Sequence, residues 1–198
     1  MKSSQIKDEV LRLICCPDDG SKVLLKNSFL ECVVCKRKFK ILGYNFLEIL
    51  PSKFPAWGLE EDEPKSAEDF YLREFNREFS WNEDTGGWGD LTDAPRLRAF
   101  YINEMQRIFE LLNPKSNGVA IDVSGGVGNY AVWLSDKVGT MVNCDLHLPS
   151  ILMANKRKKG NMVCVRTPYL ILPFVSSSFD YAICTDTLER GWNMKLSY

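Results

Sequence analysis

A cluster of three glycines in the middle of the chain limits most strongly what the chain can fold into. The apolar segment 119–123 runs into Ser124-Gly125-Gly126-Val127-Gly128, and apolar residues with helical spacing follow from Tyr130. This order predicts a buried strand, a tight turn and the start of a helix. Glycine tolerates positive φ and lets a ligand lie against the backbone. The stretch therefore predicts a ligand-binding turn, or alternatively a turn that only reverses the chain.

The segments after this turn alternate between strand and helix patterns. Strands are predicted at 119–123, 140–145, 162–165 and 179–184, and helices at 130–136 and 149–158. Such alternation predicts an α/β fold with a parallel sheet. The second strand ends at Asp145, about 20 residues beyond the glycines. A carboxylate at this distance typically accepts hydrogen bonds from a ribose diol, so a nucleoside-containing cofactor is predicted.

Four motifs in the same order resemble a known enzyme family. They are Ile121-Asp122-Val123-Ser124-Gly125-Gly126-Val127-Gly128, Cys144-Asp145, the segment from Leu172-Pro173-Phe174 to Ser178-Phe179-Asp180, and Asp186-Thr187-Leu188-Glu189. This set, over residues 119–190, resembles the class I S-adenosylmethionine-dependent methyltransferases. The resemblance implies a Rossmann-like parallel sheet, represented here by its first four strands, with S-adenosylmethionine as the cofactor and methyl transfer as the reaction.

The resemblance also assigns roles to single residues. Asp122, Ser124, Gly125, Gly126 and Gly128 would shape the pocket for the methionine part of the cofactor. Asp145 would hold the ribose hydroxyls, and Leu146 would lie beside the adenine. Thr185 and Asp186, at the end of the fourth strand, would border the methyl group. No catalytic base is assigned, because methyl transfer from a sulfonium needs one only for some acceptors.

The chain departs from the family pattern in three places. Ser124 replaces a glycine, and the segment 166–169 lacks the acid that precedes Leu172-Pro173-Phe174 in the family. Family members also continue through about three further strands, which residues 191–198 do not supply. We therefore expect a C-terminally truncated product with an open sheet edge, which a protein partner would cover.

Three functional hypotheses remain at this point. The first is a methyltransferase that acts on an unidentified acceptor, which is an RNA, a protein or a small molecule. The second is a non-catalytic interaction protein, or an inactive truncated product, that keeps a cofactor half-site. The third is a nicotinamide-dependent oxidoreductase, because Ala131 stands where a G-x-G-x-x-G motif has its last glycine.

Four cysteines lie close together near the N-terminus and suggest a metal site. Cys32 and Cys35 have the C-x-x-C spacing of a zinc knuckle, and Cys16 and Asp19 repeat that spacing with an aspartate in second place. In a reducing compartment such a cluster indicates metal binding rather than disulfides. We expect one structural zinc held by Cys16, Asp19, Cys32 and Cys35. The alternative is a ribbon that has lost its metal and is held by its apolar hairpin.

Residues 4–51 resemble the small zinc-ribbon module of the activating subunit of tRNA and release-factor methyltransferases. The residues that carry the resemblance are Cys15-Cys16-Pro17, the segment from Leu30 to Ile41, Gly43 and Leu47-Glu48-Ile49-Leu50-Pro51. Asp19 departs from the pattern, in which many members have a cysteine. The sequence thus predicts a ribbon-like module at 1–51, a linker and helix at 52–93, and an incomplete methyltransferase domain at 94–198.

Composition sets broader bounds on the function. The 198 residues are 45% hydrophobic, and the formal net charge is -1. This charge gives no overall field that would attract nucleic acid. The basic run 156–159 is interpreted as a solvated helix end. Because the chain shows neither an apolar run of membrane-spanning length nor an N-terminal signal pattern, we expect a cytoplasmic protein without membrane contact.

Overall fold

The parallel half of the molecule contains the four strands that the sequence predicts. The computed structural model describes residues 6–53, 95–185 and 187. In it, β7 (Met162–Arg166), β6 (Thr140–Asp145), β5 (Val119–Val123) and β8 (Tyr181–Ile183) lie side by side in this order, and all of their pairings are parallel. Nearly continuous apolar runs suit strands that are covered on both faces. The α/β class and the Rossmann-like parallel sheet are thus confirmed.

The ribbon-like segment forms the antiparallel half of the molecule. Its strands are β1 (Val23–Leu25), β2 (Phe29–Cys32), β3 (Lys38–Gly43) and β4 (Phe46–Glu48), and each pairs antiparallel with the next. The short helix α1 (Asp8–Leu11) precedes them. This helix ends at Leu11, because the backbone beyond Arg12 bonds with distant residues instead.

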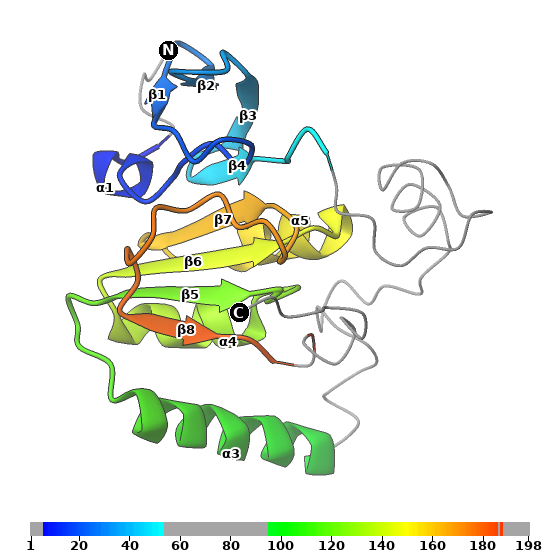
Figure 1. Cartoon of the computed structure of the whole chain (residues 1–198). Coiled ribbons are helices and arrows are strands. Elements are labelled where there is room, and N and C mark those ends of the chain that lie inside the picture. Colours follow the sequence, from blue (N-terminus) through cyan, green and yellow to red (C-terminus); the bar gives the residue numbers. More distant parts are fainter. Residues whose placement is uncertain (1–5, 54–94, 186, 188–198) are drawn as a thin grey trace, which may run out of the picture.

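Both halves belong to one eight-stranded sheet, in the order β1-β2-β3-β4-β7-β6-β5-β8. The joint is the parallel pairing of β4 with β7, in which Phe46 lies opposite Cys164 and Glu48 opposite Arg166. Figure 1 shows the ribbon strands stacked above the parallel strands along this continuous sheet. A second contact lies outside the strands, where Ile14 forms an antiparallel bridge with Phe174. The division of the chain at residues 51 and 93 stays a prediction.

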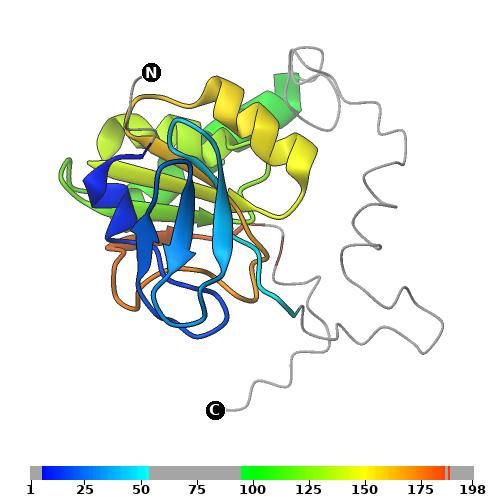
Figure 2. The same cartoon turned by 90° about the horizontal axis from the view of Figure 1, so that it is seen from above.

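Among the described residues, two helices pack against the parallel strands, and a third packs against the first of these two. The two are α4 (Asn129–Leu134), which continues into the 3-10 turn η1 (Ser135–Lys137), and α5 (Leu148–Arg157), and the third is α3 (Pro95–Leu112), which lies against α4. Figure 2 shows α4 and α5 on one face of the sheet and the connection from β7 to β8 on the other. Leu111 of α3 is 78% exposed, so it lies on the solvent side of this helix.

The two faces of the sheet have separate apolar cores. On one face, Ala120, Met141 and Met162 pack with Leu134 of α4 and Ile151 of α5. The other face is covered by the ribbon and by the connection from β7 to β8. That second core includes the ribbon residues Leu30, Cys32, Phe39 and Leu47 together with Ile121, Val142, Val163 and Val165 of the parallel strands. The ribbon thus shares a core with the parallel sheet, because it covers apolar side chains that would otherwise face water.

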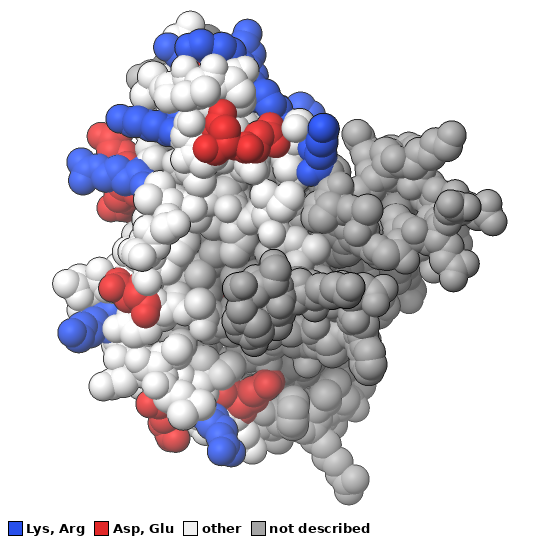
Figure 3. Space-filling view, in the orientation of Figure 1, with Lys and Arg blue, Asp and Glu red and all other residues white. Residues whose placement is uncertain are grey.

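Some predictions fall outside the residues that the structure describes. They concern most of the linker at 52–93 and Asp186. Within residues 6–53, 95–185 and 187, no helix is long and apolar enough to cross a membrane. Figure 3 shows Lys and Arg side chains gathered over the ribbon strands. Since the formal net charge of the chain is -1, this positive charge is local and is balanced elsewhere.

Candidate functional site

The glycine turn connects β5 to α4 and has an unusual backbone conformation. The φ angles of Ser124, Gly126 and Gly128 are 56°, 54° and 78°. Left-handed angles are easy for glycine, whereas they are uncommon for a residue such as Ser124. The backbone N–H of Gly128 donates to the carbonyl of Gly125 at 2.8 Å, which closes the turn just before α4 begins. The predicted strand, turn and helix are confirmed at this point.

Gly125 is the position at which a side chain is least tolerable. A Cβ atom placed there would lie 2.2 Å from Oδ1 of Asn143 and 2.5 Å from Cγ of Asp122. Both neighbours are fully buried behind the turn, so neither can move away easily. At Gly126 a Cβ would meet no atom closer than Oδ2 of Asp145, at 4.0 Å, and the obstacle there is the positive φ alone.

Asp145 connects the ends of β5 and β6. Its Oδ2 accepts a hydrogen bond from the backbone N–H of Gly126 at 2.9 Å, and its Oδ1 accepts one from the backbone N–H of His147 at 2.7 Å. Burial raises the pKa of Asp145, although these N–H groups act to lower it. Each carboxylate oxygen has two lone pairs, so both can accept a further bond from a ribose hydroxyl.

A buried acid and a buried amide support the turn from behind. Asp122 and Asn143 are opposite each other in the pairing of β5 with β6. The side-chain amide of Asn143 donates to the carbonyl of Gly126 at 3.2 Å. Within the described part of the chain, neither carboxyl oxygen of Asp122 forms a hydrogen bond of normal geometry. Burial, followed by the charge of Asp145, raises the pKa of Asp122 to about 7, against a smaller lowering by the Ala131 N–H.

Two arginines fix the backbone around the site. Nη1 of Arg157, at the end of α5, donates to the carbonyl of Val127 at 2.9 Å and to Oδ1 of Asn129 at 2.8 Å. Nε of Arg166, at the end of β7, donates to the carbonyl of Leu146 at 3.1 Å. Arg157 belongs to the basic run 156–159, which the sequence analysis interprets as a solvated helix end. That interpretation is wrong for Arg157, because its guanidinium binds Val127 and Asn129.

The structure brings the predicted cofactor residues to one edge of the sheet. Asp122, Ser124, Gly125, Gly126 and Gly128 surround the end of β5, and Asp145 and Leu146 end β6. Thr185 follows β8, which pairs with β5, so it lies at the same edge. Sequence reasoning missed Asn143, Arg157 and Arg166. No local signal in the sequence marks them, because their partners are backbone carbonyls that lie 17 to 30 residues away in the chain.

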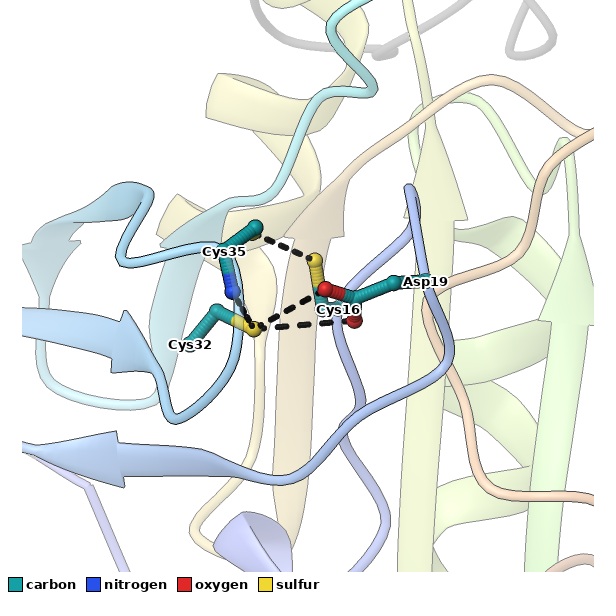
Figure 4. A group of neighbouring side chains, drawn as sticks. All are labelled: Cys16, Asp19, Cys32 and Cys35. Carbon is teal, nitrogen blue, oxygen red and sulfur yellow. Dashed lines mark hydrogen bonds between the residues drawn. The ribbon is translucent and has the colours of Figure 1, made fainter.

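A second site lies in the ribbon, where all four predicted metal ligands meet. The ligand atoms of Cys16, Asp19, Cys32 and Cys35 all lie within 4.8 Å of one another. Figure 4 shows Cys16 and Asp19 facing Cys32 and Cys35 across this cluster. Cys16 and Asp19 lie on the loop before β1, Cys32 is the last residue of β2, and Cys35 lies in the turn that follows it. Cys15 is not part of the cluster.

Two distances in this cluster are close to those between the ligands of a tetrahedral zinc ion. Sγ of Cys16 and Sγ of Cys35 are 3.6 Å apart, and Sγ of Cys32 is 3.4 Å from Oδ2 of Asp19. Ligands at the usual Zn–S and Zn–O lengths stand about 3.6 to 3.8 Å apart at the corners of a tetrahedron. Backbone N–H groups of Val34 and Cys35 each donate to Sγ of Cys32 at 3.4 Å. They lower the pKa of that thiol, although burial acts to raise it.

Comparison with known proteins supports the interpretation of the parallel half. Residues 121–194 match the family Methyltransf_11, described as a methyltransferase domain. The structure is similar to the YcgJ protein from Bacillus subtilis, with 18% identity and a TM-score of 0.39, over 41% of this chain and 37% of that one. It is also similar to Trm5b from Pyrococcus abyssi, with 24% identity and a TM-score of 0.29, over 32% of this chain and 20% of that one. No curated protein matches the chain.

The family match covers the residues that form the edge of the site. It begins within β5 and includes the glycine turn, Asp145 and the Leu172-Pro173-Phe174 segment. These segments include motifs that carry the resemblance to methyltransferases in the sequence. Over residues 121–194 the chain therefore resembles a methyltransferase domain.

Proposed function

We propose that the chain binds S-adenosylmethionine at the carboxyl ends of β5 and β6 and transfers its methyl group to an acceptor. The observation that carries this proposal is Asp145, which accepts backbone N–H groups from Gly126 and His147 and keeps lone pairs for two further bonds. The ribose diol of the cofactor supplies the matching hydroxyl donors. The RNA, protein or small-molecule nature of the acceptor stays an expectation from the sequence.

In this proposal the protein acts by binding and positioning. The glycine turn borders the methionine part, and Gly125 lets this turn pack closely against the buried layer behind it, where a side chain would collide with Asn143 and Asp122. Asp145 fixes the ribose, and Leu146 contributes to the adenine side. Bound S-adenosylmethionine supplies an activated methyl group, so catalysis depends mainly on aligning the acceptor and excluding water. No general base is required where the acceptor is nucleophilic without losing a proton.

Calorimetry with S-adenosylhomocysteine tests the cofactor site. The full chain should bind this ligand, and Asp145→Ala should weaken binding by more than about tenfold, because hydrogen bonds to a charged acceptor contribute about 1.5–3 kcal/mol each. Asp136→Asn is the matched control, since Asp136 is an exposed acid of η1 that pairs with Lys159 away from the turn. Absence of binding by the wild-type chain would reject the proposal.

A single structural zinc in the ribbon forms the second part of the proposal. Three thiolates and one carboxylate are ligands that zinc accepts, and the four ligand atoms lie within 4.8 Å of one another. Such an ion would fix the loop before β1 against the turn after β2. Metal analysis of the purified chain should find about one zinc per chain. A content below half an equivalent would contradict this assignment.

A non-catalytic role is the alternative, and the β8 edge favours it. Among the described residues, β8 pairs with β5 on one side and with no strand on the other. An unpaired edge is a site at which a protein partner can add a strand or cover the backbone. Methyl transfer by the purified chain to any acceptor would exclude the purely non-catalytic role. Cofactor binding without turnover would favour it.

A further inference from the structure

One row of residues crosses the joint between the ribbon and the parallel sheet. In the strand register, Lys40 of β3 lies opposite Glu48 of β4, Glu48 opposite Arg166 of β7, and Arg166 opposite Asp145 of β6. Residues that are directly opposite share one face of a sheet, so these four side chains follow one another on that face. Their charges alternate from positive to negative along the row. It begins in the ribbon and ends at the acid of the cofactor site.

Direct contacts link the members of this row. Nζ of Lys40 is 2.9 Å from Oε1 of Glu48, and Nη1 of Arg166 is 2.6 Å from Oε2 of the same carboxylate. The Nε atom of Arg166 donates to the carbonyl of Leu146 at 3.1 Å. Arg166 therefore uses one guanidinium edge for the ribbon and another for the turn after β6. A planar guanidinium holds two partners in fixed directions, which a lysine ammonium does not.

From these contacts we infer that Glu48 and Arg166 are positioning residues for the adenosine half of the cofactor site. Glu48 orients Arg166, and Arg166 fixes the Leu146 carbonyl in the turn that also contains Asp145 and His147. The inference rests on the proposed function, because it assumes that this turn holds the cofactor. It adds that a residue of the ribbon determines how well the parallel half binds its ligand.

Burial makes this pair more than an ordinary surface ion pair. The side chains of Arg166 and Glu48 are 21% and 12% exposed, whereas Lys40 is 75% exposed. Exposed pairs contribute little, but charges that are shielded from water interact more strongly and hold a defined geometry. Hydrogen bonds from Lys40 and Arg166 lower the pKa of Glu48, although burial acts to raise it. Glu48 is thus charged at neutral pH.

The test compares two conservative variants in the full chain. Glu48→Gln keeps the size of the side chain but removes the charge that orients Arg166. Arg166→Lys keeps the positive charge beside Glu48. A lysine ammonium, however, cannot hold both Glu48 and the Leu146 carbonyl in fixed directions, as the planar guanidinium does. Asp136→Asn is the control, because it breaks the Lys159–Asp136 pair, which has no contact with the turn after β6. The probes are S-adenosylhomocysteine and 5′-methylthioadenosine, which contains only the adenosine half.

We expect each variant to bind both probes roughly tenfold more weakly, which corresponds to a loss of about 1.4 kcal/mol in binding free energy. The loss should be equal for the two probes, because both contain the adenosine that the turn holds. Melting temperatures without ligand separate this effect from general destabilisation. Arg166→Lys should keep a melting temperature near that of the wild type while its affinity falls. If affinity instead falls only in proportion to stability, the pair has a structural role and the inference is wrong.

The outcomes distinguish this inference from the function on which it rests. A wild-type chain that binds neither probe overturns the proposed function and the inference together. A wild-type chain that binds both probes, with both variants binding equally well, overturns the inference alone. Weaker binding of S-adenosylhomocysteine with unchanged binding of 5′-methylthioadenosine also overturns it, since the effect then lies in the methionine half.

Discussion

Asp145 accepts the backbone N–H of Gly126 across 2.9 Å, so the acid that ends β6 holds the turn that ends β5. The same carboxylate accepts the N–H of His147 at 2.7 Å through its other oxygen. The two loops at this edge of the sheet are thus joined through one side chain before any ligand is bound. A substitution of Asp145 should therefore change the structure through its hydrogen-bonding groups as well as through its size.

Asp145→Asn should therefore be harmful although it preserves shape. An amide has one acceptor oxygen and one donor nitrogen, so the nitrogen must face either Gly126 N–H or His147 N–H. Leaving a donor unpaired in this partly buried place should lower the free energy of unfolding by about 1–3 kcal/mol. Urea denaturation measures this loss. Asp136→Asn serves as the control and should change stability by less than about 0.5 kcal/mol. Equal stability of the two variants would contradict the account of Asp145.

Gly125→Ala should destabilise the chain although it adds only one methyl group. The new Cβ would lie 2.2 Å from Oδ1 of Asn143, a distance that forces the buried layer to move. Overpacking of this kind costs about 1–3 kcal/mol, and the melting temperature should fall accordingly. Gly160→Ala is the matched control, because nothing lies within 4 Å of its added Cβ and its φ is not in the left-handed region. A Gly125→Ala chain as stable as Gly160→Ala would contradict the close packing.

Asp122 should make stability depend on pH in a defined direction. Burial and the charge of Asp145 raise its pKa to about 7, whereas an unfolded aspartate titrates at about 3.9. The folded state therefore binds the proton more tightly. Its contribution to stability is fully present below about pH 4 and is lost as the pH rises to 7. The loss is on the order of 1.4 kcal/mol per pH unit in that window.

Asp122→Asn removes this titration and isolates its effect. The stability of the wild type relative to Asp122→Asn should fall between pH 4.5 and pH 7 and should then level off above about pH 7.5. Urea unfolding of both chains at four or five pH values gives the difference directly. A difference that is constant over this range would show that Asp122 does not carry the raised pKa.

Arg157 should matter for cofactor binding, whereas its neighbour Lys156 should not. Arg157 holds the carbonyl of Val127 and the side chain of Asn129, so Arg157→Gln should loosen the glycine turn. We expect binding of S-adenosylhomocysteine to weaken by roughly tenfold, which corresponds to about 1.4 kcal/mol. Lys156→Gln removes the same charge from the same helix end and should leave affinity unchanged. Equal effects of both variants would favour a general electrostatic role instead.

Two substitutions of Asp19 should change the resistance of bound zinc to a chelator in opposite directions. Asp19→Ala removes a ligand and should let a chelator extract the metal at a lower concentration. Asp19→Cys supplies a fourth thiolate, which zinc accepts readily, and should make extraction harder. Cys15→Ala is the control, because Cys15 lies outside the cluster, and its zinc content should equal that of the wild type. Identical chelator curves for all variants would show that Asp19 is not a ligand.

Local patterns in the sequence predict the parallel half well. The strand at Thr140–Asp145 is matched residue for residue, because its apolar run ends at an acid and flanking turn residues limit it. The glycine turn is equally visible, since glycine is needed where φ becomes positive. The cluster of Cys16, Asp19, Cys32 and Cys35 is predicted by spacing alone, because a zinc ion would require four ligands at short separations.

Contacts between distant segments are what the sequence does not reveal. The strand β4 has three residues, and nothing in Phe46–Glu48 indicates that it pairs with β7 rather than ending the ribbon. Arg166 and Arg157 have the same local appearance as solvated basic residues. Their roles depend on carbonyl groups of Leu146 and Val127, which the fold brings near them. Because a backbone acceptor has no sequence signature, such roles become visible only in the structure.

The pairing of β4 with β7 also imposes an order in time on the growing chain. Glu48 and its partner Arg166 are 118 residues apart. At about 5 to 20 residues per second, the ribosome needs about 6 to 24 s to synthesise the chain between them. During that interval the β4 edge has no β7 to pair with and is open to other strands. The yield of soluble chain should therefore depend on translation speed. Introducing synonymous slow codons between the two strands and measuring the soluble yield tests this expectation.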